Sequence, residues 1–187
     1  MEIKALVEKL SSDPFNPENN FNVAIEYERL GQTASAVSFY LRAAEYGYNS
    51  SPEIVYTSLL KMAKCFEDQN DRKMTVSNCI LQAAAYLPNR PEAYFLLAQF
   101  YERSNEWQEC YTWASMGLLY TDDHTHLPAP VGYLGSYCLD FEKAVSGWWI
   151  GRKKESLGIF KGLLEKNIDT VYREAINNNL GKLDDSI

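Results

Sequence analysis

Small and apolar residues recur along the chain with the spacing that places them on one face of a helix. Residues at i, i+4 and i+7 share such a face. The repeated columns are Ala36, Tyr40 and Ala43; Val76, Ile80 and Ala83; Cys110, Ala114 and Gly117; and Ser156, Phe160 and Leu163. The small members let neighbouring helices approach closely, and the larger members fill the space between them. The pattern predicts helices that pack in pairs.

Prolines mark the expected starts of these paired helices. They stand at Pro17, Pro52, Pro91 and Pro130, at intervals of 35, 39 and 39 residues. Proline suits the first turn of a helix because its missing N–H has no partner there in any case. A glutamate follows each of the first three, and its charge suits the positive end of the helix dipole. A helix start repeated at this interval is typical of stacked helical hairpins.

The third predicted hairpin carries the most specific motif. Residues 94–101 read Tyr-Phe-Leu-Leu-Ala-Gln-Phe-Tyr, and a column of small residues follows in the next helix. This order of an aromatic, Leu, a small residue and Tyr resembles the tetratricopeptide repeat (TPR) signature. The first hairpin resembles it too, with Gly31 at the turn. The second matches less closely, and its first helix, from Pro52 to about Asn70, is expected to be longer than the standard one.

The remaining segments are expected to close the two ends of the stack, because the last hairpin of a solenoid otherwise leaves an apolar face in water. We predict an N-terminal capping helix in 1–12, hairpins one to three in 13–120, a loop in 121–132, and a degenerate fourth hairpin with a C-terminal capping helix in 133–187. Nothing alternates strand with helix. The predicted fold class is therefore all-α, an α-solenoid of three to four TPR-like hairpins with terminal capping helices.

Composition and charge narrow the function classes. The chain has 187 residues, 46% of them hydrophobic and 13% aromatic, which is ordinary for one folded domain or one short solenoid and argues against disorder. The formal net charge is −7, from 25 acidic and 18 basic residues. Phosphate binding needs a basic face, so a nucleic-acid partner is not expected. The basic run Arg152-Lys153-Lys154 is interpreted as a solvated turn.

Cellular location is inferred from the start of the chain and from the cysteines. The N-terminus lacks the long apolar core of a signal peptide, and no stretch approaches the roughly 18 apolar residues of a membrane span. Cys65, Cys79, Cys110 and Cys138 are far apart and form no metal-binding spacing with histidine. We expect reduced core thiols in a cytoplasmic protein with no membrane contact.

One cluster contains the side chains typical of a metal or acid–base site. Residues 122–126 read Asp-Asp-His-Thr-His and contain both histidines of the chain. Asp122, His124 and His126 could approach a zinc ion, but a polar loop between helices is more often a solvated connection. We therefore expect no metal or other cofactor. The sequence also shows no HExxH motif and no nucleophile elbow, so catalysis is not expected.

The TPR resemblance implies a partner-binding inner surface formed by the first helix of each hairpin. Carried onto this sequence, the partner-binding residues are Phe21, Ile25, Arg29, Lys61, Phe95, Gln99 and Arg103. Such a mixture of aromatic, aliphatic and arginine side chains suits recognition of a protein segment. Phe21 and Phe95 could equally pack against neighbouring helices. The carboxylate clamp of the chaperone-binding subfamily is not expected, because Phe21 and Ile25 stand at its Lys and Asn positions.

Three functions remain open at this stage. The favoured one is a scaffold without catalytic activity that binds another protein or peptide segment. Residues 133–183 also resemble the TPR region attached to certain bacterial and viral glycosyltransferases, which suggests an accessory or excised module of such an enzyme. The third is an assembly subunit of a large particle such as a phage, and self-association would then be expected.

Overall fold

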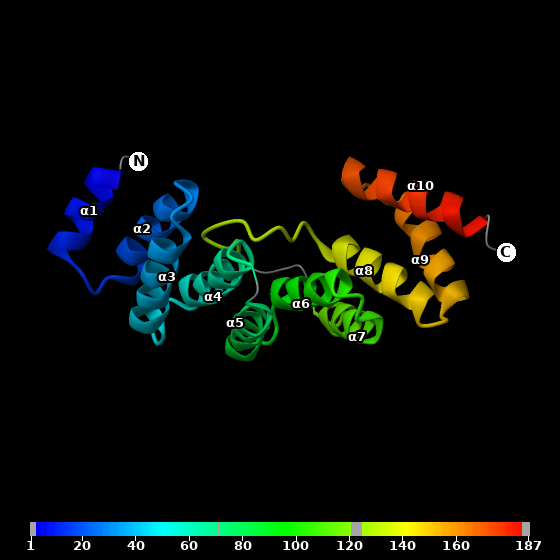
Figure 1. Cartoon of the computed structure of the whole chain (residues 1–187), viewed down its shortest axis with the longest axis horizontal. Coiled ribbons are helices and arrows are strands. Elements are labelled where there is room, and N and C mark those ends of the chain that lie inside the picture. Colours follow the sequence, from blue (N-terminus) through cyan, green and yellow to red (C-terminus); the bar gives the residue numbers. More distant parts are fainter. Residues whose placement is uncertain (1–2, 71, 121–124, 185–187) are drawn as a thin grey trace. The chain divides into compact units, whose positions relative to one another are not determined.

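The computed structural model describes residues 3–70, 72–120 and 125–184, and within them the chain forms ten helices and no strand (Figure 1). The chain divides into two compact units, and we consider each by itself. The N-terminal unit contains the described residues up to Asn89 together with 125–131. The C-terminal unit contains residues 90–120 and 132–184. The boundary at residues 89 and 90 lies between the second and third predicted hairpins.

The N-terminal unit is a series of helices in which consecutive helices pack on one another. Its helices are α1 (Ile3–Ser12), α2 (Pro17–Arg29), α3 (Thr33–Gly47), α4 (Pro52–Glu67) and α5 (Lys73–Tyr86). Residues 1 and 2 of the predicted N-terminal helix lie outside the described residues. At 16 residues, α4 is longer than the 13-residue α2, as the sequence predicts for the second hairpin.

Three of the four proline signals coincide with helix starts. Pro17, Pro52 and Pro91 each occupy the first turn of a helix. At α2 the cap is complete, because the Asn16 side-chain oxygen accepts a hydrogen bond from the backbone N–H of Asn19 at 3.0 Å. Gly31 takes the turn between α2 and α3 with φ of +70°, a conformation that glycine adopts without steric penalty.

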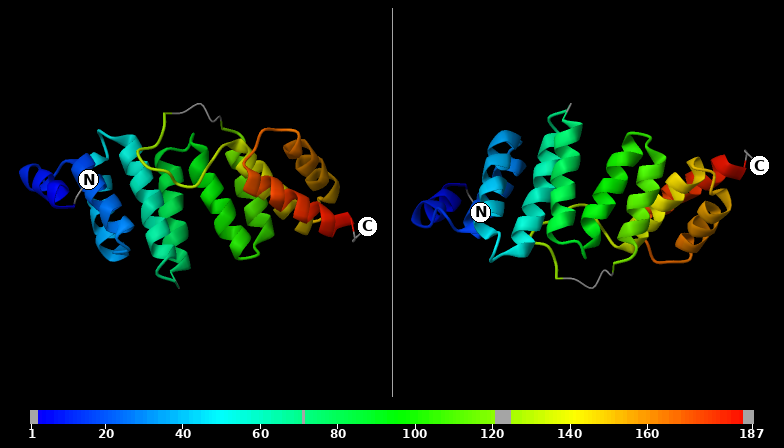
Figure 2. Two further views of the ribbon diagram at one scale, coloured as in Figure 1. Left: turned by 90° about the horizontal axis from the view of Figure 1, so that it is seen from above. Right: turned by 90° about the horizontal axis from the view of Figure 1, so that it is seen from below.

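The prediction that Pro130 begins a helix is wrong. Pro130 lies in a segment of the N-terminal unit that is neither helix nor strand, and the next helix begins only at Ser136. Pro128 and Pro130 each disfavour the helical conformation in the residue before them. Gly132 and Gly135 then follow with φ of +88° and +132°, which no continuing helix can accommodate. Figure 2 shows this segment, residues 125–131, running close to the start of α4 in both views.

The C-terminal unit repeats the hairpin arrangement. Its helices are α6 (Pro91–Arg103), α7 (Trp107–Gly117), α8 (Ser136–Trp149), α9 (Lys153–Leu164) and α10 (Thr170–Asp184). One apolar cluster joins α6, α7 and α8 around Phe95, Ala114 and Leu139. A second joins α8, α9 and α10 around Phe160 and Ile176. The last helix, α10, lies within the segment predicted to contain the C-terminal capping helix. It packs on both α8 and α9.

The four columns read from the sequence all lie in the cores. Each of their members is buried, including the less regular fourth column of Ser156, Phe160 and Leu163. Gly117 shows why a small residue is needed there. A Cβ atom on Gly117 would approach both the Leu139 side chain and the Tyr94 Cβ to 2.9 Å. The helices α6, α7 and α8 therefore pack too closely at this point for any other side chain.

Candidate functional site

The residues predicted to bind a partner are divided between the two units. Phe21, Ile25, Arg29 and Lys61 lie in the N-terminal unit on α2 and α4, whereas Phe95, Gln99 and Arg103 lie in the C-terminal unit on α6. All of them come from the first helix of a hairpin, as the TPR resemblance implies. Their side chains have different environments, however, and the structure sorts them into buried, paired and exposed groups.

Phe21 and Phe95 are buried and offer no surface to a partner. Phe21 is 2% exposed, and its ring meets the Tyr40 ring edge to face at 5.7 Å. Phe95 is 1% exposed, with its ring centroid 5.5 Å from that of Tyr133. Both phenylalanines thus pack inside the protein, as the alternative interpretation of the sequence expects. They are excluded from the candidate surface.

Lys61 is held inside the N-terminal unit by an ion pair. Its Nζ lies 3.0 Å from Glu28 Oε1, and only 15% of the lysine side chain is exposed. The second carboxylate oxygen of Glu28 accepts a hydrogen bond from the Tyr40 hydroxyl. Burial is the main cause that raises the pKa of Tyr40, and the Glu28 carboxylate raises it further. This network joins α2, α3 and α4, so Lys61 stabilises the hairpins and is not free for a partner.

Ile25 and Arg29 remain available on α2. Ile25 is half-buried, and the Arg29 side chain is 67% exposed. Arg29 forms a salt bridge one turn back to Glu26, with 2.6 Å between Nη2 and Oε1. Only 11% of the Glu26 side chain is exposed, so Arg29 keeps this partner, and the outward-facing N–H groups of its guanidinium can donate to a second carboxylate.

Gln99 and Arg103 lie beside a buried carboxyl group that the sequence analysis did not single out. Glu142 on α8 is 4% exposed, and within the described residues its Oε2 has no hydrogen-bond partner. Burial raises the pKa of Glu142 to about 7, and the nearby Glu102 carboxylate adds to the shift. A hydrogen bond from Gln99 and the charge of Arg103 act in the opposite direction. Helical spacing from Cys138 to Glu142 to Ser146 was the signal that could have placed this glutamate inside.

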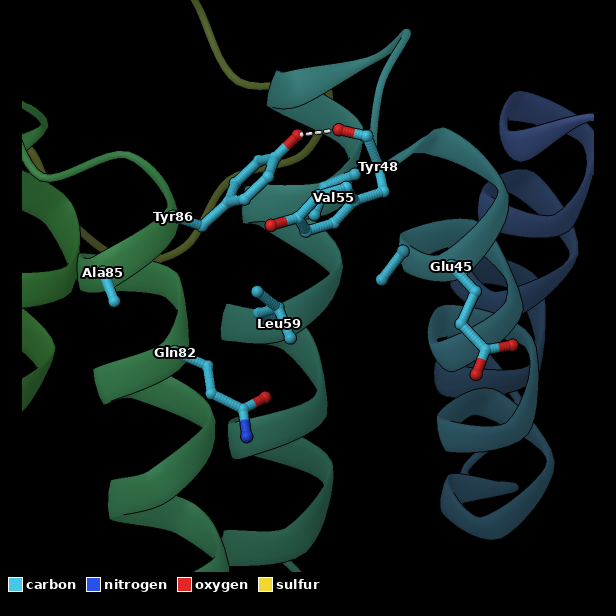
Figure 3. A pocket seen from close by; sticks show the side chains of 8 residues that line it. Glu45, Tyr48, Val55, Leu59, Gln82, Ala85 and Tyr86 are labelled. Carbon is cyan, nitrogen blue, oxygen red and sulfur yellow. Dashed lines mark hydrogen bonds between the residues drawn. The ribbon is translucent and has the colours of Figure 1, made fainter.

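The N-terminal unit contains a groove between α3, α4 and α5 (Figure 3). Its volume is about 370 Å³, and it is lined by Ala44, Glu45, Tyr48, Val55, Leu59, Gln82, Ala85 and Tyr86. The Tyr86 hydroxyl donates a hydrogen bond to the Tyr48 carbonyl at 2.6 Å, and the two rings lie 5.2 Å apart. Tyr48 is 61% exposed. An exposed aromatic side chain beside an apolar hollow favours binding of another molecule.

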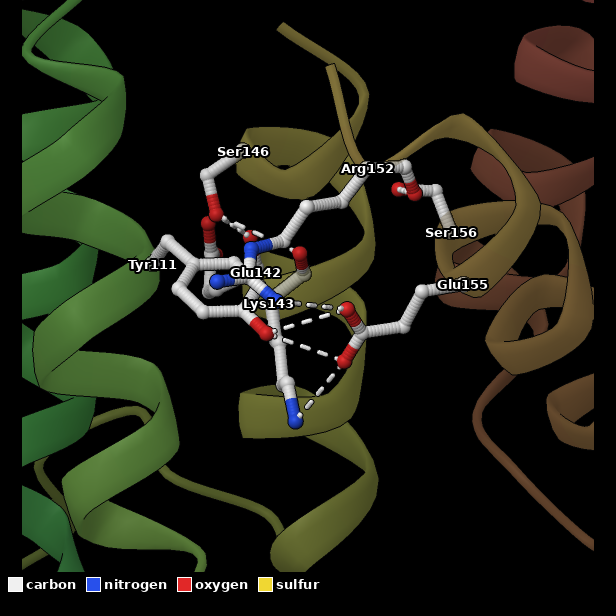
Figure 4. Close-up of polar contacts among 7 residues, drawn as sticks. All are labelled: Tyr111, Glu142, Lys143, Ser146, Arg152, Glu155 and Ser156. Carbon is white, nitrogen blue, oxygen red and sulfur yellow. Dashed lines mark hydrogen bonds and ion pairs between the residues drawn. The ribbon is translucent and has the colours of Figure 1, made fainter. Parts of the chain in front are cut away.

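A polar cluster joins α7, α8 and α9 in the C-terminal unit (Figure 4). Glu155 accepts a hydrogen bond from the Tyr111 hydroxyl at 2.9 Å and forms ion pairs with Lys143 at 3.2 Å and Arg152 at 3.5 Å. Both cations also lie over the Tyr111 ring. Burial acts to raise the pKa of Glu155, but Tyr111, Lys143 and Arg152 outweigh it and hold the pKa below its usual value. Arg152 lies in the exposed turn before α9, where the sequence predicts a solvated turn, and from there it also contacts Glu155 and Tyr111.

The metal candidates lie partly outside the described residues, and the thiol candidates are buried. Asp122 and His124 lie outside the described residues, and His126 is exposed. Within the described residues, no three His, Cys, Asp or Glu side chains gather in a way that could hold a metal ion. All four cysteines are free and buried. Burial raises the pKa of Cys65 and of Cys110 to about 12, so both thiols stay protonated and unreactive at neutral pH.

Comparison with solved structures confirms the all-α, TPR-like solenoid fold. MamA aligns with a TM-score of 0.65 at 16% identity, over 87% of this chain and 85% of MamA. PilF of Pseudomonas aeruginosa aligns with a TM-score of 0.66 at 11% identity, over 94% and 72% of the two chains. A TPR protein of Thermus thermophilus aligns with a TM-score of 0.60 at 16% identity, over 95% and 88%. No protein-family model and no curated protein matches the sequence. In the described part of the chain, no helix is long and apolar enough to cross a membrane.

Proposed function

We propose that the chain is a scaffold without catalytic activity that binds a segment of another protein. The observation that carries this proposal is the groove between α3, α4 and α5, which is apolar, lined by tyrosines and left unfilled by the residues around it. Tyrosine supplies a large contact area with little loss of conformational entropy, which is why it is enriched where proteins bind one another. A cytoplasmic location, expected from the sequence, belongs to the same proposal.

A second surface, on α2 of the N-terminal unit, belongs to the proposal as well. Ile25 and Arg29 on α2 present an apolar group next to a cation. The TPR resemblance implies that partners bind along the first helix of each hairpin. Because Phe21 and Lys61 are buried or paired, this surface is smaller and more polar than the sequence predicts.

The experiment that tests the proposal compares the two surfaces in one assay. Tagged wild-type protein is used to capture partners from the lysate of its native host, and mass spectrometry identifies them. Ala85→Arg places a long side chain into the groove from an exposed position, and Ala34→Arg is its matched control on the exposed face of α3. Ile25→Asp with Arg29→Glu tests the α2 surface. Loss of one defined partner with Ala85→Arg alone supports the groove, whereas loss with the α2 variant alone supports the first-helix surface.

Other outcomes of that experiment would overturn the proposal. If capture is unchanged by every variant, neither surface binds the partner. A transferase among the captured proteins would favour the glycosyltransferase-module alternative. A discrete homo-oligomer of the pure protein in light scattering, without any captured partner, would favour the assembly-subunit alternative. No contact among the described residues favours either alternative over the scaffold.

A further inference from the structure

Residues 125–131 lie against the N-terminal unit in the manner of a docked peptide. The segment reads Thr-His-Leu-Pro-Ala-Pro-Val and contains neither helix nor strand. From Leu127 to Val131 its burial alternates. Leu127 and Val131 are half-buried and Ala129 is 8% exposed, whereas Pro128 and Pro130 between them are exposed. This alternation means that one side of the segment faces a surface and the other faces solvent, while the backbone bends at Pro128 and Ala129.

The position of the segment in the chain makes this docking unusual. Residues on both sides of it in the sequence belong to the C-terminal unit, yet the segment itself belongs to the N-terminal unit. Thr125 anchors it there, because the Thr125 hydroxyl donates a hydrogen bond to Glu53 Oε1 on α4 at 3.2 Å. Both views of Figure 2 place the segment beside the start of α4. None of its residues lines the groove described above.

We propose that residues 125–131 are an internal ligand, which occupies a binding surface at the start of α4 for extended protein segments of the same pattern. A partner of this class carries small or medium apolar residues at alternate positions, separated by prolines. This inference rests on the proposed scaffold function and names the kind of segment that the scaffold receives. The α4 surface is then closed in the free protein, and a partner segment binds only by displacing residues 125–131.

The chemistry of the segment explains its fit to such a surface. Proline restricts the backbone to extended conformations before binding, so less conformational entropy is lost on docking. Its missing N–H is no disadvantage on the side that faces solvent. The connecting chain raises the effective concentration of the segment to the millimolar range, so even a weak intrinsic affinity keeps it docked. A competing segment must therefore bind more tightly than the internal one.

The test uses a fluorescent peptide of residues 125–131 and the full-length protein. In the variant Leu127→Ser/Ala129→Asp/Val131→Ser, the inward side chains lose their apolar contacts and the surface is vacated. We expect this variant to bind the peptide at least about tenfold more tightly than the wild type, because it lacks the tethered competitor. His126→Ser, at an outward position, is the matched control and should bind like the wild type. Circular dichroism verifies that all three proteins have the same helix content.

Two results would overturn the inference. One is equal peptide affinity of the vacated variant and the wild type. The other is no binding to the vacated variant up to about 5 mM peptide, since a segment that is docked through a millimolar effective concentration must have a dissociation constant below that range. Failure of the scaffold proposal is a separate observation. If the vacated variant binds the peptide but no cellular partner is captured, the internal-ligand proposal holds and the scaffold proposal fails. If a cellular partner is captured but the vacated variant does not bind the peptide, the scaffold proposal holds and the internal-ligand proposal fails.

Discussion

The N-terminal and C-terminal units each bring a glutamate into the space between their helices, but the two glutamates have opposite partners. Glu28 faces the ammonium group of Lys61 and the hydroxyl of Tyr40, so both of its oxygens are satisfied. Glu142 is more deeply buried, one of its oxygens has no hydrogen-bond partner among the described residues, and the nearest charge that raises its pKa is a second carboxylate, Glu102. Similar hairpins can therefore contain a stabilising polar network or a destabilising one.

The difference shows that backbone packing does not determine the electrostatics of a helical repeat. An unpaired buried carboxylate is costly unless it takes up a proton, and the pKa of Glu142 near 7 reflects this cost. The groups around it are Gln99, Glu102 and Arg103 on α6, Cys110 on α7, and Tyr172 on α10. The stability of the C-terminal unit should thus depend on pH near neutrality.

The largest effect is expected from Glu142→Gln. A folded-state pKa raised from 4.5 to about 7 means that the folded protein binds this proton more tightly than the unfolded protein. The stability that this proton provides is fully present below pH 4.5 and is lost as the pH rises through 7. Glutamine mimics the protonated form, so the variant should be more stable than the wild type by about 3 kcal/mol at pH 8.5 and nearly equal to it at pH 4.

Urea unfolding followed by tryptophan fluorescence measures this effect in the right unit, because all four tryptophans lie in the C-terminal unit. Glu174→Gln, at an exposed position on α10, is the control and should leave the pH dependence unchanged. Equal stability of Glu142→Gln and the wild type at pH 8.5 would show that Glu142 has an ordinary pKa.

A steric prediction follows for the same unit. Gly117→Ala should destabilise the C-terminal unit by about 2 kcal/mol, because the new Cβ meets the Tyr94 Cβ, which cannot move without its helix. Gly158→Ala on α9 is the matched control, since nothing lies within 4 Å of its Cβ position. It should stabilise by about 0.5 kcal/mol through its higher helix propensity. Thermal unfolding of both variants, read by fluorescence, compares them directly.

The satisfied network of the N-terminal unit can be broken by Lys61→Met. Methionine keeps most of the volume but removes the charge, so Glu28 retains only the Tyr40 hydroxyl. The network is partly exposed to solvent, so we expect a loss of about 1–2 kcal/mol, less than for a fully buried pair. Circular dichroism should detect the loss, while the tryptophan signal of the C-terminal unit stays unchanged. A fluorescence transition that shifts as well would mean that the two units unfold together.

The smallest effect is expected from Glu102→Gln. Removing this carboxylate takes away the lesser of the two causes that raise the pKa of Glu142, and burial remains. The pH at which the C-terminal unit loses stability should fall by a few tenths of a unit, with a gain of less than about 1 kcal/mol at pH 8.5. Urea unfolding followed by tryptophan fluorescence, repeated at several pH values, measures this shift in the pH at which stability is lost. A gain in stability at pH 8.5 as large as that of Glu142→Gln would show that repulsion by Glu102 outweighs burial.

The periodic part of the fold could be predicted from the sequence, because helical spacing directly determines which residues share a face. Columns such as Ala36, Tyr40 and Ala43 are buried for this reason. The same signal could not identify the partner-binding surface. Spacing places Phe21 and Phe95 on a face of the first helix but does not say which neighbouring helix covers that face. The groove was missed because its lining comes from three helices and depends on how far apart they lie.

The segment around Pro130 shows a second feature that the sequence pattern did not predict correctly. Pro130 follows Pro91 at the same interval as Pro91 follows Pro52, so the period alone predicts a fourth helix start. The period fails here because three nearby residues disfavour a helix, namely Pro128, Gly132 and Gly135. The alternation of Leu127, Ala129 and Val131 was visible in the sequence, but it shows docking only when the surface beneath is known.

The docked segment also has a consequence for the order in which the protein is made. The first five helices are complete at residue 89, but the piece that covers the start of α4 ends at residue 131. A ribosome must add about 40 further residues, including all of α6 and α7, before that piece exists. At typical elongation rates of roughly 5–20 residues per second, the α4 surface of each nascent chain is uncovered for a few seconds. During that interval a partner segment can bind there without a competitor.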